Sequence, residues 1–455
     1  MSSLFKSLRE NFKRVTDSQQ LVDGLAASTV NKAVRANDFD RIDVLLGRGY
    51  SLAAYNLKGE TAFHEAIRAG STTMAKFLID RGADPLQPCQ GAYQNPIHVA
   101  IAANQPRMIS FLKALGAPLD EFSENGLAPL HHAVNEEKAD VIKALIRAGA
   151  DPVLRTKTGR TATMMAISSN KTAALQAVLS EPLAHKSFQS SYYKKFNNLE
   201  PPLGLAIQLG RIEAIEAMID AGLGVNHRGK NNKTPLHSAV EYKNTDLMLY
   251  FLKKGADVNK ARNDAGQTPL HMLCSMRMLT KAQDFFATAF DHLINYGSDS
   301  LIQDDAGYSS LYYLVNSAEM TTARFQACLE TTTADINSYY APEGEMALAE
   351  DLLNRGDVAC LEQLLTHKRI AIDERYGHHQ QTLIHMAVSK DQPEMTEMLL
   401  RYKPDLMVTD INGETVLDIA NRYQNQSKAA ILIKAQPRAS DDRPKPSKPR
   451  RPKPD

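Results

Sequence analysis

The most informative stretch of the sequence reads Thr234-Pro235-Leu236-His237-Ser238-Ala239, and Lys254-Gly255-Ala256-Asp257-Val258-Asn259 follows it. Threonine is a good helix N-cap because its hydroxyl accepts a hydrogen bond from a backbone N–H of the first turn. Proline suits the next position, because its φ is preset for a helix and its missing N–H would be unpaired there. Glycine fits the left-handed residue that ends a helix. The stretch therefore predicts one helix that begins after Thr234 and a second that ends near Gly255.

Variants of the first phrase return along the chain about every 33 residues. They begin at Thr61, Asn95, Ala128, Thr268 and Thr382. This pattern resembles the ankyrin repeat, whose Thr-Pro-Leu-His signature has that period. The resemblance implies an all-α solenoid of stacked helix-turn-helix units with short β-hairpin loops. It also implies that the signature histidine forms hydrogen bonds between neighbouring turns.

The spacing predicts about 12 units between residues 28 and 435, each about 34 residues long. Their expected cap positions are Ser28, Thr61, Asn95, Ala128, Thr161, Pro201, Thr234, Thr268, Ser309, Met346 or Ala347, Thr382 and Thr415. A residue with positive φ is expected two positions before each cap, where the loop turns sharply. Glycine takes that place in six units, at Gly59, Gly126, Gly159, Gly266, Gly307 and Gly413. Asn232 and Gln380 replace it in two others, and asparagine is the better substitute.

The rhythm breaks at four places. The spacing grows to 40 residues between Thr161 and Pro201, which predicts a weak junction at residues 180–200 where the array divides into two blocks. It grows to 41 residues between Thr268 and Ser309, which predicts a longer loop or a longer second helix near residues 278–286. In the unit at Ser309 a tyrosine, Tyr312, replaces the signature histidine. The unit near residue 346 lacks the whole signature and is assigned on spacing and on the apolar residues 361–365.

Residues 1–27 form an N-terminal segment before the array. Five apolar residues fall on one helical face, and the basic residues lie mostly off it, which predicts an amphipathic helix. The apolar residues are Leu4, Phe5, Leu8, Phe12 and Val15. Two interpretations remain open: the helix lies on an anionic membrane surface, or it covers the exposed end of the first repeat.

Residues 436–455 form a proline-rich tail with seven Lys or Arg against three Asp. Because the tail has no large apolar residue, it cannot pack a core, and we expect it to be disordered. Its composition fits contact with an acidic surface, a nucleic acid or an SH3-like groove. A purely solubilising role is the open alternative.

The composition restricts the class of protein. A formal net charge of +1 over 455 residues argues against a broadly basic nucleic-acid binder. The four cysteines are widely spaced, so neither a disulfide framework nor a zinc site is expected, and a reducing, cytoplasmic compartment is predicted. No apolar run is long enough to span a membrane, and the N-terminus lacks the apolar stretch of a signal peptide.

The sequence predicts no catalytic residue, metal site or other cofactor. Six of the 13 histidines occupy the signature position, and two adjacent pairs, at residues 131–132 and 378–379, lack further ligands at metal-binding spacing. The common nucleotide-binding, zinc-protease and serine-hydrolase motifs are missing from the sequence. An enzyme hidden in the irregular region 268–375 is a rival hypothesis, and it requires a pocket with converging polar groups.

The resemblance implies that partners bind on the concave side, at the hairpin tips and the exposed positions of the first helices. The residue after the signature histidine is expected to be one such exposed position, and Tyr312 joins the set because tyrosine is common in interface hot spots. The candidate partner-binding residues are Val99, His132, Met165, Leu205, Met272, Tyr312, Tyr313 and Met386. Of these, Met165 and Leu205 are the most expected to turn inward, since they flank the 40-residue spacing. The tyrosine pairs at residues 192–193 and 339–340 are further candidates, or they fill distorted repeats.

Together these observations predict a non-enzymatic, monomeric scaffold or adaptor that binds a protein partner through the concave ankyrin groove. The alternative is a membrane- or nucleic-acid-associated factor recruited by the N-terminal helix or the basic tail. A secreted bacterial effector that acts in a host cell is a further alternative. The identity of the partner does not follow from the sequence.

Overall fold

The computed structural model describes residues 23–90, 95–181, 202–276, 283–332, 336, 340–342 and 347–423. The predicted amphipathic helix before residue 23, the residues added at 182–201 and the proline-rich tail lie outside these ranges. The chain divides into two compact units, Met1–Leu247 and Met248–Asp455, and each is described by itself.

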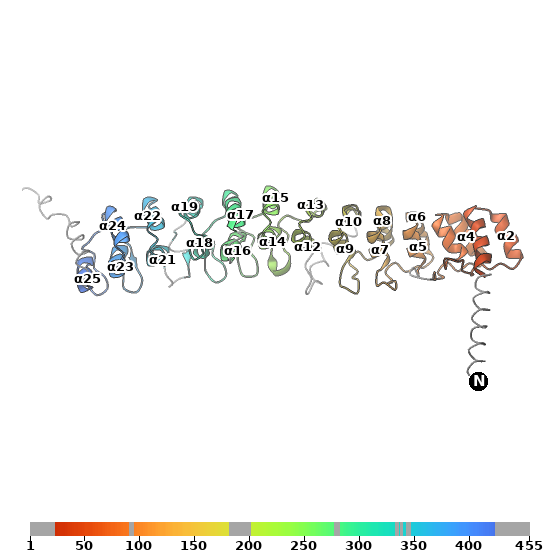
Figure 1. Ribbon diagram of the computed structural model, residues 1–455, viewed down its shortest axis with the longest axis horizontal. Coiled ribbons are helices and arrows are strands. Elements are labelled where there is room, and N and C mark those ends of the chain that lie inside the picture. The colour runs from red at the N-terminus through yellow and green to blue at the C-terminus, as the bar shows by residue number, and fades with distance from the viewer. Residues whose placement is uncertain are drawn as a thin grey trace, which may run out of the picture. The chain divides into compact units, whose positions relative to one another are not determined.

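The N-terminal unit is a series of helix pairs that begins with a helix over residues 23–35. Its further helices are α2 (Phe39–Gly47), α3 (Ala62–Arg68), α4 (Thr72–Asp80), α5 (Pro96–Ala102), α6 (Pro106–Ala114), α7 (Pro129–Asn135), α8 (Ala139–Ala148), α9 (Ala162–Ser168), α10 (Thr172–Leu179), α12 (Pro202–Gln208), α13 (Ile212–Asp220) and α14 (Pro235–Glu241), with a 3₁₀ turn at Lys230–Asn232. First helices α3, α5, α7, α9, α12 and α14 contact one another in order, and so do second helices α6, α8, α10 and α13. In the pair α7–α8, the first helix lies between the second helix and the connecting loop (Figure 1).

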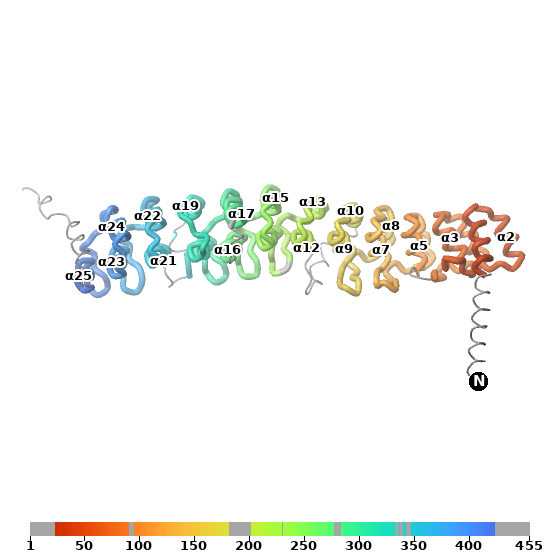
Figure 2. The backbone as a smooth tube through the Cα atoms, in the orientation of Figure 1, coloured from red at the N-terminus to blue at the C-terminus, as the bar shows by residue number. Residues whose placement is uncertain are grey.

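The C-terminal unit repeats this arrangement. Helix α15 (Thr245–Lys253) crosses the boundary between the units, and the elements after it are α16 (Pro269–Ser275), α17 (Gln283–Asn295), α18 (Ser310–Val315), α19 (Thr322–Thr331), α21 (Leu348–Arg355), α22 (Val358–Thr366), β1 (Arg375–Tyr376), β2 (Gln381–Thr382), α23 (Leu383–Ser389), α24 (Pro393–Arg401) and α25 (Val416–Arg422). Second helices α17, α19, α22 and α24 contact one another in order. Within each unit the chain passes from pair to pair in sequence order (Figure 2). The predicted all-α ankyrin-repeat solenoid is confirmed.

The degenerate unit near residue 346 is a regular helix pair. Helix α21 contacts α23, and α22 contacts both α19 and α24, so the pair stacks like its neighbours. It retains an apolar face without the signature, since Leu348, Leu352 and Leu353 are fully buried. A longer second helix accounts for part of the extra length of the unit at Thr268, because α17 has 13 residues and α15, the second helix of the preceding unit, has 9. The predicted junction at residues 180–200 stays a prediction, although α9 contacts α12 and α10 contacts α13 across it.

The predicted cap at Ser28 is wrong. The chain is already helical at residue 23, and the Ser28 hydroxyl donates to the carbonyl of Gly24 at 2.7 Å instead of capping a helix. This back-bond is the ordinary way in which serine satisfies its hydroxyl inside a helix. The helix extends past Ser28 because Ala27 and Val30 continue one buried face on both sides of it.

At four first helices the signature threonine and histidine close the N-terminus together. In the unit at Thr234, the backbone N–H of Thr234 donates to His237 Nδ1 at 3.2 Å, and its Oγ1 lies 2.8 Å from the same nitrogen. The same pair of contacts is found at Thr61, Thr268 and Thr382. Because a backbone N–H donates to Nδ1, the ring proton is on Nε2. The histidine thus acts as the reciprocal partner of a capping box.

The second ring nitrogen ties one repeat to the next. His131 Nε2–H donates to the carbonyl of Leu154 at 3.1 Å in the N-terminal unit. His271 Nε2–H donates to the carbonyl of Tyr308 at 3.2 Å in the C-terminal unit. Both carbonyls belong to the loop that precedes the next first helix. The hydrogen bonding implied by the family resemblance is therefore confirmed at these two histidines.

Four of the loops are closed by an Asn or Asp side chain rather than by a long strand ladder. The Oδ1 atom of Asn263 accepts the N–H groups of Ala265 and Gln267, each at 3.0 Å, and Asn56, Asp304 and Asp410 repeat this pattern. All six predicted glycines, together with Asn232 and Gln380, have positive φ. At Gly266 an added Cβ would lie 2.7 Å from the backbone nitrogen of Asp305, so this site also excludes a side chain on steric grounds.

His131 accepts the backbone N–H of Ala128, as the signature histidines do for threonine in other units. The side chain of Ala128, however, has no hydroxyl with which to cap the helix. Ala128 is fully buried, as the threonine is in four equivalent places, so the same side chain fits there. We expect Ala128→Thr to raise the free energy of unfolding by about 1 kcal/mol. The reverse change, Thr234→Ala, should lower it by about the same amount. Urea unfolding followed by circular dichroism tests both, and a destabilising Ala128→Thr would contradict the capping argument.

Burial also makes the signature histidines sensitive to acid. It lowers the pKa of His64 and of His98 to about 4, and it lowers the pKa of His131, His271 and His385. At pH values between the ordinary histidine pKa of about 6.5 and the lowered pKa of about 4, these histidines bind a proton in the unfolded chain but not in the folded chain. The stability is therefore fully present at neutral pH and is lost as the pH falls through this window.

We expect each of His64 and His98 to remove about 2 kcal/mol of stability when the pH falls from 7.5 to 5. The His98→Asn variant should reduce this pH dependence, and Asn31 already occupies the equivalent place in the first unit. Urea midpoints at the two pH values give the measurement, with His367→Asn, at an exposed histidine, as the control. A pH dependence that is unchanged in His98→Asn and reduced in His367→Asn would contradict this assignment.

Candidate interaction surface

The position after the signature histidine faces the preceding repeat and the loop. Arg35 Nε donates to the Glu65 carboxylate at 2.8 Å from the first helix of the preceding unit. His132 Nε2 lies 2.9 Å from Ser123 Oγ in its own loop, and its ring packs edge-on against His98 at 4.8 Å. The hydroxyl of Tyr313 donates to Asp304 Oδ2 at 2.8 Å. These side chains are therefore used within the array.

The predicted exposure of this position is wrong at four of the candidate residues. Val99 is 2% exposed, Met386 6%, His132 7% and Met272 8%. The physical reason is the shortness of the first helix, which has neighbouring helices on three sides, namely two first helices and the second helix of its own pair, as well as the adjoining loop. In α5, six of the seven residues are buried. These four positions therefore offer a partner very little area.

Met165 and Leu205, which were the most expected to turn inward, are instead half-buried. They occupy equivalent positions on α9 and α12, two first helices that contact each other. Leu209 lies one helical turn beyond Leu205 and is 43% exposed. We call Met165, Leu205 and Leu209 the apolar stripe of the N-terminal unit. Sequence reasoning missed Leu209 because it considered only the position after the histidine.

In the C-terminal unit, Tyr312 and Tyr313 are half-buried members of an aromatic cluster. The ring centroid of Tyr312 lies 4.5 Å from Tyr308 and 5.3 Å from Tyr340, and Tyr313 lies 6.2 Å from Tyr308. The buried Tyr340 fixes this cluster: its hydroxyl donates to Asp351 Oδ2 at 2.6 Å, and its carbonyl accepts the Ser309 hydroxyl at 2.9 Å. Tyr312 thus fills the space of the missing histidine, and the cap passes to Ser309.

Burial and a neighbouring carboxylate keep two of these phenols protonated. Burial, and then the Asp304 carboxylate, raise the pKa of Tyr313 to about 12. Burial and the Asp351 carboxylate also raise the pKa of Tyr340. Both rings therefore act as neutral hydrogen-bond donors at physiological pH rather than as acids. Tyr308 was not predicted, and the tyrosine candidates at residues 192, 193 and 339 lie outside the described residues.

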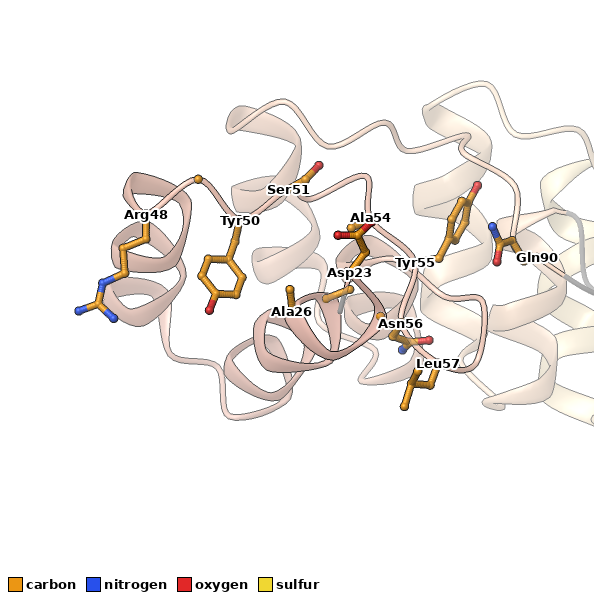
Figure 3. Close-up of a pocket in the computed structure, with 13 residues that line it drawn as sticks. Asp23, Ala26, Arg48, Tyr50, Ser51, Ala54, Tyr55, Asn56, Leu57 and Gln90 are labelled. Carbon is orange, nitrogen blue, oxygen red and sulfur yellow. The ribbon is translucent and has the colours of Figure 1, made fainter. Parts of the chain in front are cut away.

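A hollow of about 810 Å³ lies at the N-terminal end of the described chain. Asp23 and Ala26 line it from the first helix, the loop from Arg48 to Leu57 forms most of its wall, and Gln90 contributes from the next loop (Figure 3). The hydroxyl of Tyr55 donates to the carbonyl of Pro88 at 3.0 Å. No feature of the sequence predicted this hollow, because it forms only where the loop folds back toward the helix.

Other site chemistry is limited in the described residues. No three His, Cys, Asp or Glu side chains gather there in an arrangement that holds a metal ion. Burial raises the pKa of the thiols of Cys89, Cys274, Cys328 and Cys360, so they are protonated at neutral pH. None of the helices that the structure describes combines the length and apolar character needed to cross a bilayer.

Known proteins resemble this chain over part of its length. Human palmitoyltransferase ZDHHC13 is 24% identical over 221 residues, which is 49% of this chain and 33% of that protein. The B-cell lymphoma 3 protein homolog of Mus musculus is 28% identical over 183 residues, which is 39% of this chain and 40% of that protein. The chain thus matches less than half of the length of these curated relatives.

The solved ankyrin repeat domain of Bcl-3, described as a unique member of the IkappaB protein family, covers 56% of this chain. The match covers 93% of that domain, at 20% identity and a TM-score of 0.38. The model of three-copy ankyrin repeats matches residues 30–123, 97–190, 177–262 and 203–286, and the model of many-copy ankyrin repeats matches residues 364–420. These matches cover more than half of the sequence, and the chain belongs to the ankyrin-repeat family.

Proposed function

We propose that this protein is a non-catalytic scaffold that binds a protein partner, in line with the general role of ankyrin repeats in protein–protein interaction. The observation that carries the proposal is the apolar stripe of Met165, Leu205 and Leu209. Met165 and Leu205 keep exposed area at a first-helix position that is buried at five other places in the chain, namely Glu65, Val99, His132, Met272 and Met386. Leu209 adds an apolar side chain that is 43% exposed directly after α12. An exposed apolar surface on a folded array is a common mark of a binding site.

The chemistry of the stripe suits a protein ligand. Leu205 lies in α12 and Leu209 directly after it, and the backbone N–H of Leu209 still donates to the carbonyl of Leu205, so the two side chains lie one helical turn apart and a partner side chain can contact both. Met165 adds a flexible thioether that adapts to irregular partner surfaces. We infer a partner that presents apolar side chains, and burial of about 100 Å² of such area would contribute roughly 2–3 kcal/mol.

Several findings support a role without catalysis. The signature histidines are neutral, and their ring nitrogens serve the caps and the links between repeats. The buried thiols are protonated, so they are poor nucleophiles. One relative is named a palmitoyltransferase, but this chain matches only 33% of it, and that activity belongs to the whole relative.

Monomeric state, a cytoplasmic location and delivery to a host cell stay predictions. Membrane or nucleic-acid binding through the termini concerns residues 1–22 and 436–455, which lie outside the described residues.

The test is affinity capture with the intact chain, followed by quantitative mass spectrometry. In the double variant Met165→Asp/Leu205→Asp, desolvating two carboxylates should lower capture of the specific partner at least tenfold. The matched control is Ile212→Asp, which places the same charge on an apolar residue that is 41% exposed in the adjacent second helix. At the first position of that helix, an acidic residue is well tolerated.

Thermal unfolding of each variant establishes that the array remains folded. Undiminished capture by a folded Met165→Asp/Leu205→Asp protein would remove the apolar stripe as the binding site. Equal losses in the double variant and in Ile212→Asp would also contradict the proposal, because recognition would then not depend on the side of the helix pair.

A further inference from the structure

Charge is distributed very unevenly along this nearly neutral chain. Between residues 282 and 354 the sequence has 12 Asp or Glu and a single basic residue, Arg324. That guanidinium is already used, because it pairs with the largely buried Glu319 carboxylate at 3.2 Å and lies 4.9 Å from the ring of Phe286. Among the residues that the structure describes, no other acid of this segment has an ion pair within 4 Å. The segment therefore has a formal net charge of −11 (12 acids against one Arg), and the next cation along the chain is Arg355.

The tyrosine cluster lies within this acidic segment. Tyr308, Tyr312 and Tyr313 are half-buried, so each keeps part of its ring accessible, and Asp305 is an exposed carboxylate in the same loop. The buried Asp304 carboxylate holds Tyr313 in place by accepting the hydrogen bond of its hydroxyl. We call Tyr308, Tyr312, Tyr313 and Asp305 the tyrosine surface. The aromatic rings and the negative charge together suit a ligand that presents positively charged groups and apolar groups that pack flat against a ring.

Arginine, lysine and proline are the side chains that fit such a surface. Cations bind over tyrosine faces within about 6 Å of the ring centroid, and nearby carboxylates strengthen this attraction. Proline-rich segments dock on surfaces lined by aromatic rings, because their extended conformation is preformed and loses little entropy. A ligand that combines basic residues with prolines would use both effects.

We propose that residues 436–455 of the same chain dock on the tyrosine surface. This tail has seven Lys or Arg against three Asp, and its last 12 residues contain five prolines that alternate with basic residues. Its charge is opposite to that of the acidic segment. Both lie in the C-terminal unit, so the contact is formed within that unit.

The tail is long enough to reach this surface. Helices α18, α21, α23 and α25 follow one another along the C-terminal unit (Figure 1), and the axes of packed helices are typically about 8–10 Å apart. The distance to be covered is therefore roughly 30 Å. Twenty residues separate Tyr423 from Arg443, and a chain of that length spans at most about 70 Å when it is extended. Chain length thus permits the contact without movement of the repeats.

An intramolecular ligand has a regulatory consequence. The tail is present at an effective concentration in the millimolar range, so weak individual contacts are enough to keep it bound. An external basic segment would bind to the same place only after displacing the tail. This inference is independent of the apolar stripe, which lies in the N-terminal unit.

The first experiment uses the absence of tryptophan from the chain. In full-length Tyr308→Trp, the single indole reports on the tyrosine surface through acrylamide quenching. Reversing the tail charge with Arg443→Glu, Lys445→Glu and Lys448→Glu should raise the quenching constant at least twofold. Salt at 0.5 M should have a similar effect, because the attraction is electrostatic.

The matched control is Tyr296→Trp, at a tyrosine that is 42% exposed directly after α17. Its quenching should not change with the tail substitutions or with salt. If charge reversal changes neither indole, or changes both equally, the tail does not dock on the tyrosine surface and the proposal is overturned.

A second experiment keeps all the tyrosines and so does not depend on folding of the tryptophan variants. A carbodiimide joins a lysine amine to a carboxylate as an amide, with loss of one water that the activating reagent takes up. Mass spectrometry of the full-length chain should find Lys445, Lys448 or Lys453 linked to Asp305, and Asp305→Asn should remove the main product.

The control is Asp291→Asn, which removes an exposed carboxylate from the second helix α17 of the same unit. It should leave the main product unchanged. Links spread evenly over Asp291 and Asp305 would overturn the proposal. A yield that rises with protein concentration would overturn it as well, because the tail would then be bound to a second copy of the chain.

Discussion

The imidazole of the signature histidine is the contact on which the array depends. One nitrogen accepts the backbone N–H of the residue that caps its own helix, and in His131 and His271 the other donates to the loop of the next repeat. A single neutral ring thus fixes both the start of a helix and the distance to its neighbour. Since each repeat contacts only adjacent repeats, stability is the sum of many such local links. Burial of the ring keeps it neutral, and only the neutral ring has an acceptor and a donor at once.

Because the first helices pack against one another, few of their side chains remain exposed to bind a partner. The side chains after the histidine contact the preceding repeat, as Glu65 does with Arg35 and His132 does with His98. Large half-buried apolar and aromatic residues remain where the pattern is irregular: Met165 and Leu205 flank the long spacing, and Tyr312 replaces a histidine. The departures from the consensus are therefore the places where the array differs from a uniform surface.

Where the signature is lost, other residues take over its separate tasks. Ser309 caps α18 by accepting the N–H of Tyr312 at 3.2 Å, and it donates its hydroxyl to Tyr340. Asp418 replaces the histidine in the last described helix, and its carboxylate accepts the N–H of Thr415 at 2.9 Å. In α21 packing alone is sufficient, because Leu348 and Leu352 are fully buried. The fold therefore tolerates loss of the signature as long as the caps and the apolar face survive.

The sequence alone determined the repeat period, the positive-φ loop positions and most of the helix caps, because these depend on residues only a few places apart. The cap predicted at Ser28 was the exception, since the buried face of that helix continues through it. The degenerate unit was also placed correctly from its spacing. The burial of Val99, Met272 and Met386 was not predictable in this way, since it depends on neighbours about 33 residues distant in the chain. The same holds for the hollow beside Asp23 and for the meeting of Tyr308 with Tyr312 and Tyr340. Local chemistry sets where each helix starts, whereas stacking decides which side chains remain available to a ligand.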